Sequence, residues 1–152
     1  MRIRKATVKD VNQISELLLA LANQFIFPTL TDQGQENLSR SMSPESIRHL
    51  LDTGYDYNVG CLNNEIIGVV ATRADTHLYH LFVRQQNQAK GYSRLLWQYA
   101  KARCIAGENT GTFTVNSSLN AESVYQSWGF VPDSGIREAN GVKDIPMTLK
   151  LN

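Results

Sequence analysis

The chain has 152 residues, a length typical of one domain, and we expect residues 1–152 to form a single domain. Hydrophobic residues make up 42% and charged residues 19%, which excludes a disordered or fibrous protein. Fifteen Lys and Arg offset fourteen Asp and Glu, so no strong charge favours a nucleic-acid or membrane partner. The sequence lacks a signal-peptide pattern and any run approaching the roughly 20 apolar residues that span a bilayer, so we expect a cytoplasmic protein.

The chain begins with a predicted strand at Arg2–Lys5, followed by a helix. Thr7 is placed to cap this helix, and Asp10 to reach back to the cap. Apolar residues at helical spacing predict its buried stripe: Val11, Ile14, Leu17, Leu18, Leu21 and Phe25. A strand followed by a helix is therefore predicted for residues 2–25.

Residues 26–42 are polar and broken by Pro28 and Gly34, so they are predicted to form a long connection without regular structure. Ser43 and Pro44 then begin a short helix. Three strands rich in aromatic and β-branched residues follow, at 55–61, 66–73 and 77–83. Two helices and three successive strands are thus predicted up to residue 83.

The second half begins with a helix from residue 92 to about 107, whose predicted face comprises Leu95, Leu96 and Tyr99. A strand follows at 112–116. A last helix is predicted because apolar and aromatic residues occur at i, i+3, i+4 and i+7: Ala121, Val124, Tyr125 and Trp128. Asn120 is its predicted cap, and Asn140-Gly141 predicts a final hairpin. The order of elements predicts an α/β (α+β) fold with about four helices.

The two cysteines, Cys61 and Cys104, lie in apolar-patterned segments without the spacing of metal ligands. A cytosolic setting would keep them as buried, reduced thiols. We therefore expect no metal site.

The segment from residue 81 to residue 93 is the most informative about chemistry, because a strand there leads into a helix through a turn of small residues. Such a turn presents unpaired backbone N–H groups, and the helix dipole adds positive potential. Gly91 would let a pyrophosphate approach the backbone, and Ser93 would add a hydroxyl. The same pattern is also typical of a plain turn, and it is neither a P-loop nor a dinucleotide fingerprint.

Two blocks of sequence have a more specific pattern. The first contains Gln88-Ala89-Lys90-Gly91-Tyr92-Ser93, and the second runs from Val115 through Tyr125 to Trp128-Gly129-Phe130. Together they resemble the GNAT superfamily of acyl-CoA-dependent N-acetyltransferases, whose pyrophosphate signature is Gln/Arg-x-x-Gly-x-Gly/Ala. Ser93 departs from that signature but is small, so we expect only a modest effect on cofactor affinity. The resemblance covers nearly the whole chain and implies a mixed, mostly antiparallel central sheet that splays between two central parallel strands.

The resemblance also implies which residues would bind acetyl-CoA. The backbone of Phe82 and Val83 would pair with the pantetheine arm like an added strand. The backbone of seven successive residues would hold the pyrophosphate: Gln88, Ala89, Lys90, Gly91, Tyr92, Ser93 and Arg94. Asn116 and Asn120 would flank the arm where the parallel strands separate, and for Asn120 this role is compatible with helix capping.

Tyr125 matches the family's general acid, which protonates the departing coenzyme A thiolate. A phenol of pKa about 10 can donate to a thiolate whose acid has a pKa of about 8.5 when the site stabilises the exchange. Without the resemblance, its place on an apolar helical stripe would be typical of a core residue. The implied reaction is direct attack by a neutral amine through a tetrahedral intermediate, which the backbone N–H of Val83 would stabilise.

The base is left open by the sequence. An alkylammonium group has a pKa of about 10.4, so removing its proton near neutral pH costs roughly 4 kcal/mol. Strand alternation predicts that His77 and His80 point to opposite faces. The strand resembles that of the arylalkylamine-acetylating branch, where a His-x-His occurs; His77 falls on the first position, and Tyr79 replaces the second. His77, His80 or a water chain can serve as base, and His77 can equally be structural.

These features predict an N-acetyltransferase that moves acetyl from acetyl-CoA to a primary amine of a small molecule or peptide. The alternative from another class is a non-catalytic acyl-CoA-binding sensor or interaction module with the same fold, and the presence of Tyr125 favours the enzyme. The acceptor is expected to contact residues 26–42 and the final hairpin. Its identity, any preference for a longer acyl group and the oligomeric state stay open, although many relatives form homodimers.

Overall fold

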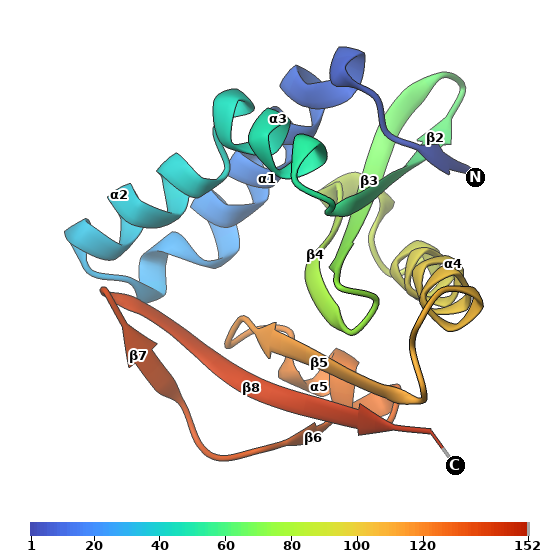
Figure 1. Cartoon of the computed structure of the whole chain (residues 1–152). Coiled ribbons are helices and arrows are strands. Elements are labelled where there is room, and N and C mark those ends of the chain that lie inside the picture. Colours follow the sequence, from blue (N-terminus) through green and yellow to red (C-terminus); the bar gives the residue numbers. More distant parts are fainter. Residues whose placement is uncertain (152) are drawn as a thin grey trace.

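The computed structural model describes residues 1–151, which build one central eight-stranded sheet (Figure 1). Its strand order is β1-β2-β3-β4-β5-β8-β6, and β7 also pairs with β8. The strands are β1 Arg2–Lys5, β2 Asp56–Leu62, β3 Glu65–Arg73, β4 His77–Val83, β5 Thr112–Ser117, β6 Val131–Pro132, β7 Arg137–Ala139 and β8 Val142–Lys150. Within the described chain, β4 and β5 are the one parallel pair, which confirms the predicted mixed, mostly antiparallel sheet.

In the part of the chain that the structure describes, five α-helices accompany the sheet. They are α1 Val11–Phe25, α2 Asp32–Ser41, α3 Pro44–Asp52, α4 Tyr92–Ala106 and α5 Glu122–Ser127, with 3₁₀ turns at Val8–Asp10, Phe27–Thr29 and Gln85–Asn87. One apolar core joins α1 and α3 to β2 and β3, and a second joins α4 to β4, β5 and β8. Because both faces of β3 are covered, every residue from 66 to 72 is buried. None of the helices in residues 1–151 is long and apolar enough to cross a membrane.

The predicted cap near the N-terminus is confirmed. Thr7 accepts a hydrogen bond from the backbone N–H of Lys9, and the backbone N–H of Thr7 donates to Asp10 over 2.8 Å. The guanidinium of Arg4 donates to both oxygens of Asp10, and this ion pair lowers the pKa of the Asp10 carboxyl. The cap therefore begins the 3₁₀ turn that leads into α1, and the ion pair between Arg4 and Asp10 connects this turn to β1.

Residues 26–42 contradict the prediction of a connection without regular structure, because they contain a 3₁₀ turn and the ten-residue helix α2. Thr31 caps α2, and its hydroxyl accepts from the backbone N–H of Gly34 over 3.0 Å. Leu38 is the α2 residue that packs on the first core. Most of the helix is polar, so its sequence carries little apolar periodicity, and tertiary contacts stabilise it instead.

One of these tertiary contacts joins α2 to the turn between β7 and β8, which lies beside it in Figure 1. The side-chain amide of Asn37 donates to the backbone carbonyl of Asn140, 103 residues along the chain. A Cβ on Gly34 would overlap the carbonyl group of Gly141, and a Cβ on Gly141 would overlap the Thr31 hydroxyl. Both turn residues have positive φ, 54° at Asn140 and 79° at Gly141, which confirms the predicted hairpin.

The buried face of α4 differs from the prediction. Leu95 is 48% exposed, whereas Leu96 is fully buried. The buried stripe consists of Leu96, Trp97, Ala100 and Cys104. Trp97 lies on the side of the helix that faces the second core, where its ring packs against Phe113 and Phe130 at centroid distances of 5.2 and 5.6 Å. The preference of this large aromatic ring for the core overrides the leucine spacing.

Asn58 on β2 is a buried polar side chain without a partner. It lies opposite Val70 of β3, on the face that α4 covers, and is 1% exposed. Its amide nitrogen and oxygen make no hydrogen bond to the residues that the structure describes. A buried unsatisfied amide costs about 1 to 3 kcal/mol. We therefore expect Asn58→Val to raise the free energy of unfolding by about that amount, measured by urea denaturation.

Asn109 provides the matched control, since it is buried but fully bonded. Its amide nitrogen donates to the carbonyls of Asp75 and Thr112, and its oxygen accepts from the backbone N–H of Gly111. Asn109→Val should therefore lower the free energy of unfolding. A loss of stability in both variants would show that Asn58 is satisfied in solution.

Candidate active site

The two parallel strands β4 and β5 separate soon after they meet. Their register covers two pairs, His77 with Thr114 and Leu78 with Val115, and the described chain shows no further pairing between them. The predicted splay between the parallel strands is thereby confirmed. The opening is lined by backbone on one side, because β4 continues to Val83 beside β3.

The backbone of β4 presents two N–H groups to this opening. The backbone N–H of Arg84 donates to Ile67 on β3 over 2.8 Å, so these two residues form a hydrogen-bonded pair. Antiparallel pairs alternate, and the N–H groups of Val83 and Leu81 therefore point away from β3. The backbone of Phe82 faces β3 by the same alternation. Of the two residues predicted to pair with the pantetheine arm, Val83 presents its N–H to the opening and Phe82 does not, whereas Leu81 presents its N–H as well.

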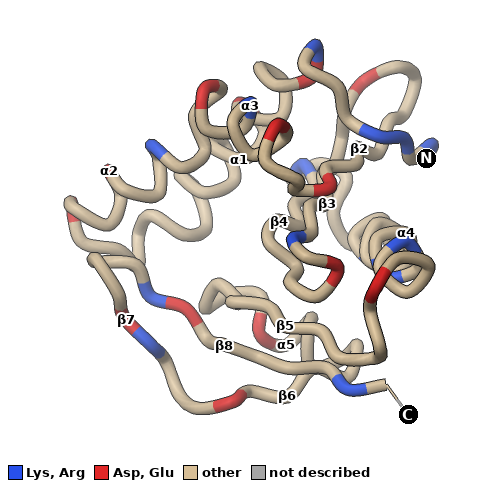
Figure 2. Tube along the Cα trace, viewed as in Figure 1, with Lys and Arg blue, Asp and Glu red and all other residues tan. Residues whose placement is uncertain are grey.

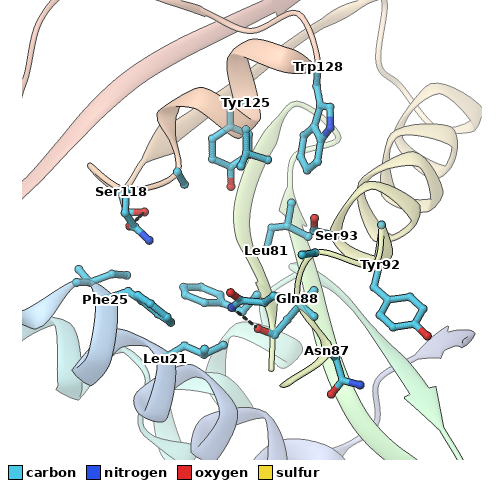
Figure 3. A pocket seen from close by; sticks show the side chains of 18 residues that line it. Leu21, Phe25, Leu81, Asn87, Gln88, Tyr92, Ser93, Ser118, Tyr125 and Trp128 are labelled. Carbon is cyan, nitrogen blue, oxygen red and sulfur yellow. Dashed lines mark hydrogen bonds between the residues drawn. The ribbon is translucent and has the colours of Figure 1, made fainter. Parts of the chain in front are cut away.

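A cavity of about 380 Å³ occupies the opening (Figure 3). Its walls come from α1, the end of β4, the turn before α4, and the segment from residue 118 through α5 to Trp128. Leu21 and Phe25 of α1 form the apolar side opposite α5. We call this space the first cavity.

The turn at the mouth of the first cavity has the geometry of an anion site. Gly91 caps α4 with a left-handed φ of 83°, and Ala89 also has a positive φ, 61°. The side-chain amide of Gln88 donates to the Val83 carbonyl over 2.9 Å and fixes the turn against β4. The first N–H groups of α4, including that of Ser93, have no acceptor within the helix. A Cβ on Gly91 would meet no atom within 4 Å, so the space above it is open.

Most residues predicted from the pyrophosphate signature line this cavity. They are Gln88, Ala89, Gly91, Tyr92 and Ser93. Lys90 and Arg94 are exposed and lie outside its lining. Their side chains can therefore supply positive charge only at the rim.

The two predicted asparagines of the opposite wall are separated by the structure. Asn120 lines the first cavity, whereas Asn116 lines the neighbouring one. The predicted helix cap at Asn120 is wrong, because the N-cap of α5 is Ala121 and has no side-chain cap bond. The Asn120 side-chain oxygen instead accepts from the Ser118 hydroxyl over 2.7 Å.

Tyr125 lies between the two cavities and lines both. Its ring contacts Trp128 and Phe130 at centroid distances of 5.7 and 5.6 Å, and its hydroxyl points into the first cavity (Figure 3). Burial raises the pKa of this phenol above its ordinary value. The hydroxyl therefore keeps its proton at neutral pH, and its transfer to a thiolate requires that the site stabilise the phenolate that forms.

The second cavity, of about 390 Å³, adjoins the first. Six residues line both: Ile26, Leu81, Phe82, Ser118, Ala121 and Tyr125. Its outer walls come from α2 with Met42 and from residues 142–144 of β8. The segments predicted to contact an acceptor, residues 26–42 and the hairpin, therefore both contribute to it.

His77 lines the second cavity and is 9% exposed. Its Nδ1 lies 2.8 Å from the hydroxyl of Thr114 on β5. Burial lowers the pKa of His77 below its usual value, and the positive charges of Arg73 and Arg137 lower it further. The imidazole is therefore neutral at pH 7 and can accept a proton.

His80 also lines the second cavity, so the prediction that the two histidines face opposite sides is wrong. A register shift between Ala71 and Thr72 leaves Tyr79 as an extra residue in β4 and interrupts the alternation. The Tyr57 hydroxyl lies 3.0 Å from His80 Nδ1, and burial raises the pKa of Tyr57. The direction of this hydrogen bond follows the imidazole tautomer, because a phenol hydroxyl can donate to Nδ1 or accept from it. Burial lowers the pKa of His80 to about 3, so its imidazole is neutral at pH 7.

The sequence matches the family model of the acetyltransferase (GNAT) domain over residues 26–151. The chain belongs to the GNAT family. No protein of curated function matches it significantly in sequence.

Solved structures share the GNAT fold at low sequence identity. The GCN5-related N-acetyltransferase from Rhodopseudomonas palustris has a TM-score of 0.85 and 17% identity, over 99% of this chain and 95% of that chain. The PaiA N-acetyltransferase from Thermoplasma acidophilum, in complex with coenzyme A, has a TM-score of 0.77 and 16% identity, over 99% and 98%. An aminoglycoside 6′-N-acetyltransferase complexed with coenzyme A has a TM-score of 0.72 and 14% identity, over 99% and 97%.

Some residues of this GNAT site gave no functional signal in the sequence. Leu21 and Phe25 line the first cavity, but their helical spacing predicts burial and does not distinguish a core from a cavity wall. Ser118 lines both cavities and falls inside the second matched block, which is the one signal that could have found it.

Proposed function

We propose that this GNAT domain transfers an acetyl group from acetyl-CoA to a primary amine of a small molecule or peptide. The observation that carries the proposal is the position of Tyr125, a protonated hydroxyl at the junction of two adjoining cavities. The first cavity opens at a turn suited to a pyrophosphate, and the second contains two neutral histidines. In this arrangement the donor and the acceptor enter from different sides and meet at Tyr125.

In the proposed complex, the turn from Gln88 to Arg94 holds the pyrophosphate at the start of α4. The backbone edge of β4 at Leu81 and Val83 runs along the pantetheine arm, Asn120 flanks the arm in the first cavity, and Asn116 faces the acceptor in the second. The acceptor nitrogen attacks the thioester carbon, and the N–H of Val83 stabilises the oxyanion that forms. When the carbon–sulfur bond breaks, Tyr125 gives its proton to the coenzyme A thiolate.

For the proton of the amine, we propose His77 as acceptor, directly or through a water molecule. Its pKa, lowered by burial and by two arginines, keeps it unprotonated across the neutral range. His80 is less suited to this role, because burial lowers its pKa to about 3 and makes it a very weak base. Proton acceptance by His77 is lost only as the pH falls below its lowered pKa.

We therefore expect His77→Gln to lower turnover about tenfold or more at pH 7, since general base catalysis contributes at least this much. The loss should shrink toward pH 9, because more of the acceptor amine is then already neutral. The measurement is the pH profile of turnover, with His49→Gln as control for an exposed histidine on α3. A uniform loss at every pH would assign His77 a positioning role, and an unchanged profile would leave water as the base.

The proposal as a whole is tested by following free thiol released from acetyl-CoA across a panel of primary amines. Release that depends on both the amine and the protein, with the N-acetylated product identified by mass spectrometry, is the expected result. Binding of acetyl-CoA without transfer to any amine would instead support a non-catalytic acyl-CoA-binding module. Repeating the assay with longer acyl-CoA thioesters would define which acyl group the first cavity prefers.

A further inference from the structure

The charges around the second cavity are unevenly distributed. Two cationic side chains, Arg73 from the end of β3 and Lys143 from β8, line it, whereas Asp144 is the one carboxylate in its lining within residues 1–151. Arg137 binds both oxygens of Asp144, at 3.0 and 2.9 Å, and so neutralises this carboxylate. The cavity therefore carries a net positive charge.

Neither cation is held in an ion pair by the residues that the structure describes, although charges of both signs lie along the β7–β8 hairpin (Figure 2). Among these charges, Glu138 lies opposite Lys143 across the hairpin. The field of Arg73 reaches the cavity interior, because it acts on the pKa of both His77 and Tyr79. Arg73 is exposed, so its guanidinium is free to move toward a ligand.

A positive field has two effects on an amine acceptor. It repels ammonium groups, which disfavours a polycation, because such a ligand would need carboxylates around it. It also lowers the pKa of the one amine that reacts, and this eases the formation of the neutral nucleophile. A cavity of this kind binds well only an amine that also brings a negative charge.

We propose that the acceptor is an amine that carries an anionic group, a carboxylate or a phosphate, which Arg73 and Lys143 bind. This inference rests on the proposed acetyl transfer and specifies the acceptor of the same site. The guanidinium of Arg73 presents the paired donors that match either anion. The same cavity is also lined by Leu38, Tyr79 and Phe82, which suit a hydrophobic body on the acceptor.

The test compares acceptors that differ only in the anion. L-phenylalanine and phenethylamine form the carboxylate pair, phosphoethanolamine and ethanolamine form the phosphate pair, and spermidine represents a polycation. We expect at least one anionic member to have a kcat/KM at least tenfold above that of its neutral partner and above that of spermidine. Arg73→Gln and Lys143→Gln should each raise KM for that member about tenfold, without changing that for its partner. Arg48→Gln is the control, since Arg48 is exposed on α3 and lines neither cavity.

Calorimetry on protein saturated with coenzyme A gives a second readout, because it requires no turnover. The inference is supported when an anionic member binds more tightly than its neutral partner and Arg73→Gln weakens that binding. This holds even when no thiol is released, and in that case only the proposed acetyl transfer is wrong. Transfer to the neutral member that is equal or faster in both pairs, or transfer to spermidine that matches both anionic members, overturns the inference and leaves the proposed activity standing. Absence of binding by both anionic members also overturns it.

Discussion

Tyr125→Phe is expected to lower turnover by about 10²-fold or more, because it removes the proton that the proposed mechanism gives to the coenzyme A thiolate. The ring itself should stay in place, since its contacts with Trp128 and Phe130 involve the aromatic faces and edges rather than the hydroxyl. Acetyl-CoA affinity should change little. Steady-state kinetics with a responsive acceptor, together with calorimetric titration of acetyl-CoA, measure the two quantities separately.

Tyr99→Phe serves as the control for Tyr125→Phe. Tyr99 lies on α4, is half-buried and lines neither cavity, so its loss of a hydroxyl should leave turnover unchanged. A Tyr125→Phe protein with wild-type turnover would remove Tyr125 from the mechanism. A large loss in both variants would point to a general effect on folding.

Gly91→Glu is expected to weaken acetyl-CoA binding by about 10²-fold. Two unit charges about 4 Å apart repel by about 4 kcal/mol at an effective dielectric constant of about 20, and a flexible exposed side chain would realise part of this. The space above Gly91 is open, so the new carboxylate projects toward the proposed pyrophosphate rather than into protein. Calorimetric titration with acetyl-CoA measures the change in Kd.

A change at Gly91 also strains the backbone, because its φ of 83° disfavours any side chain. Gly54 after α3 is a matched control, with a φ of 93° and nothing within 4 Å of its own Cβ position. Gly54→Glu should carry a similar strain and leave acetyl-CoA affinity unchanged. If both variants bind acetyl-CoA like the wild type, the pyrophosphate site lies elsewhere.

Elements with strong local signals were predicted correctly from the sequence. The strands of the sheet have β-branched and aromatic residues, and the Asn140-Gly141 hairpin has the side chains that positive φ requires. Helix α2 was missed because its residues are mostly polar, and its contacts with the hairpin depend on a position 103 residues away. Local periodicity contains no information about such a contact.

In the candidate site too, features that depend on contiguous residues were easier to predict than features that depend on pairing between strands. The turn at Gly91 and the placement of Tyr125 follow from motifs that are contiguous in sequence. The orientation of His80 depends on one extra residue in β4, and its hydrogen-bond partner, Tyr57, comes from another strand. Whether β4 offers Leu81 or Phe82 to the opening depends on its hydrogen-bond register with β3. Such features are set by pairing between strands, which a strand's own residues do not specify.

The contact between Gly34 and Gly141 couples two segments that are distant in the sequence. Both α2 and the hairpin contribute to the wall of the second cavity, and at Gly34 and Gly141 their backbones touch directly. A methyl group at either glycine would force the segments apart and widen the cavity between them. A larger residue at one of these positions therefore requires a compensating change in the other segment, so the shape of the second cavity depends on the two segments as a pair.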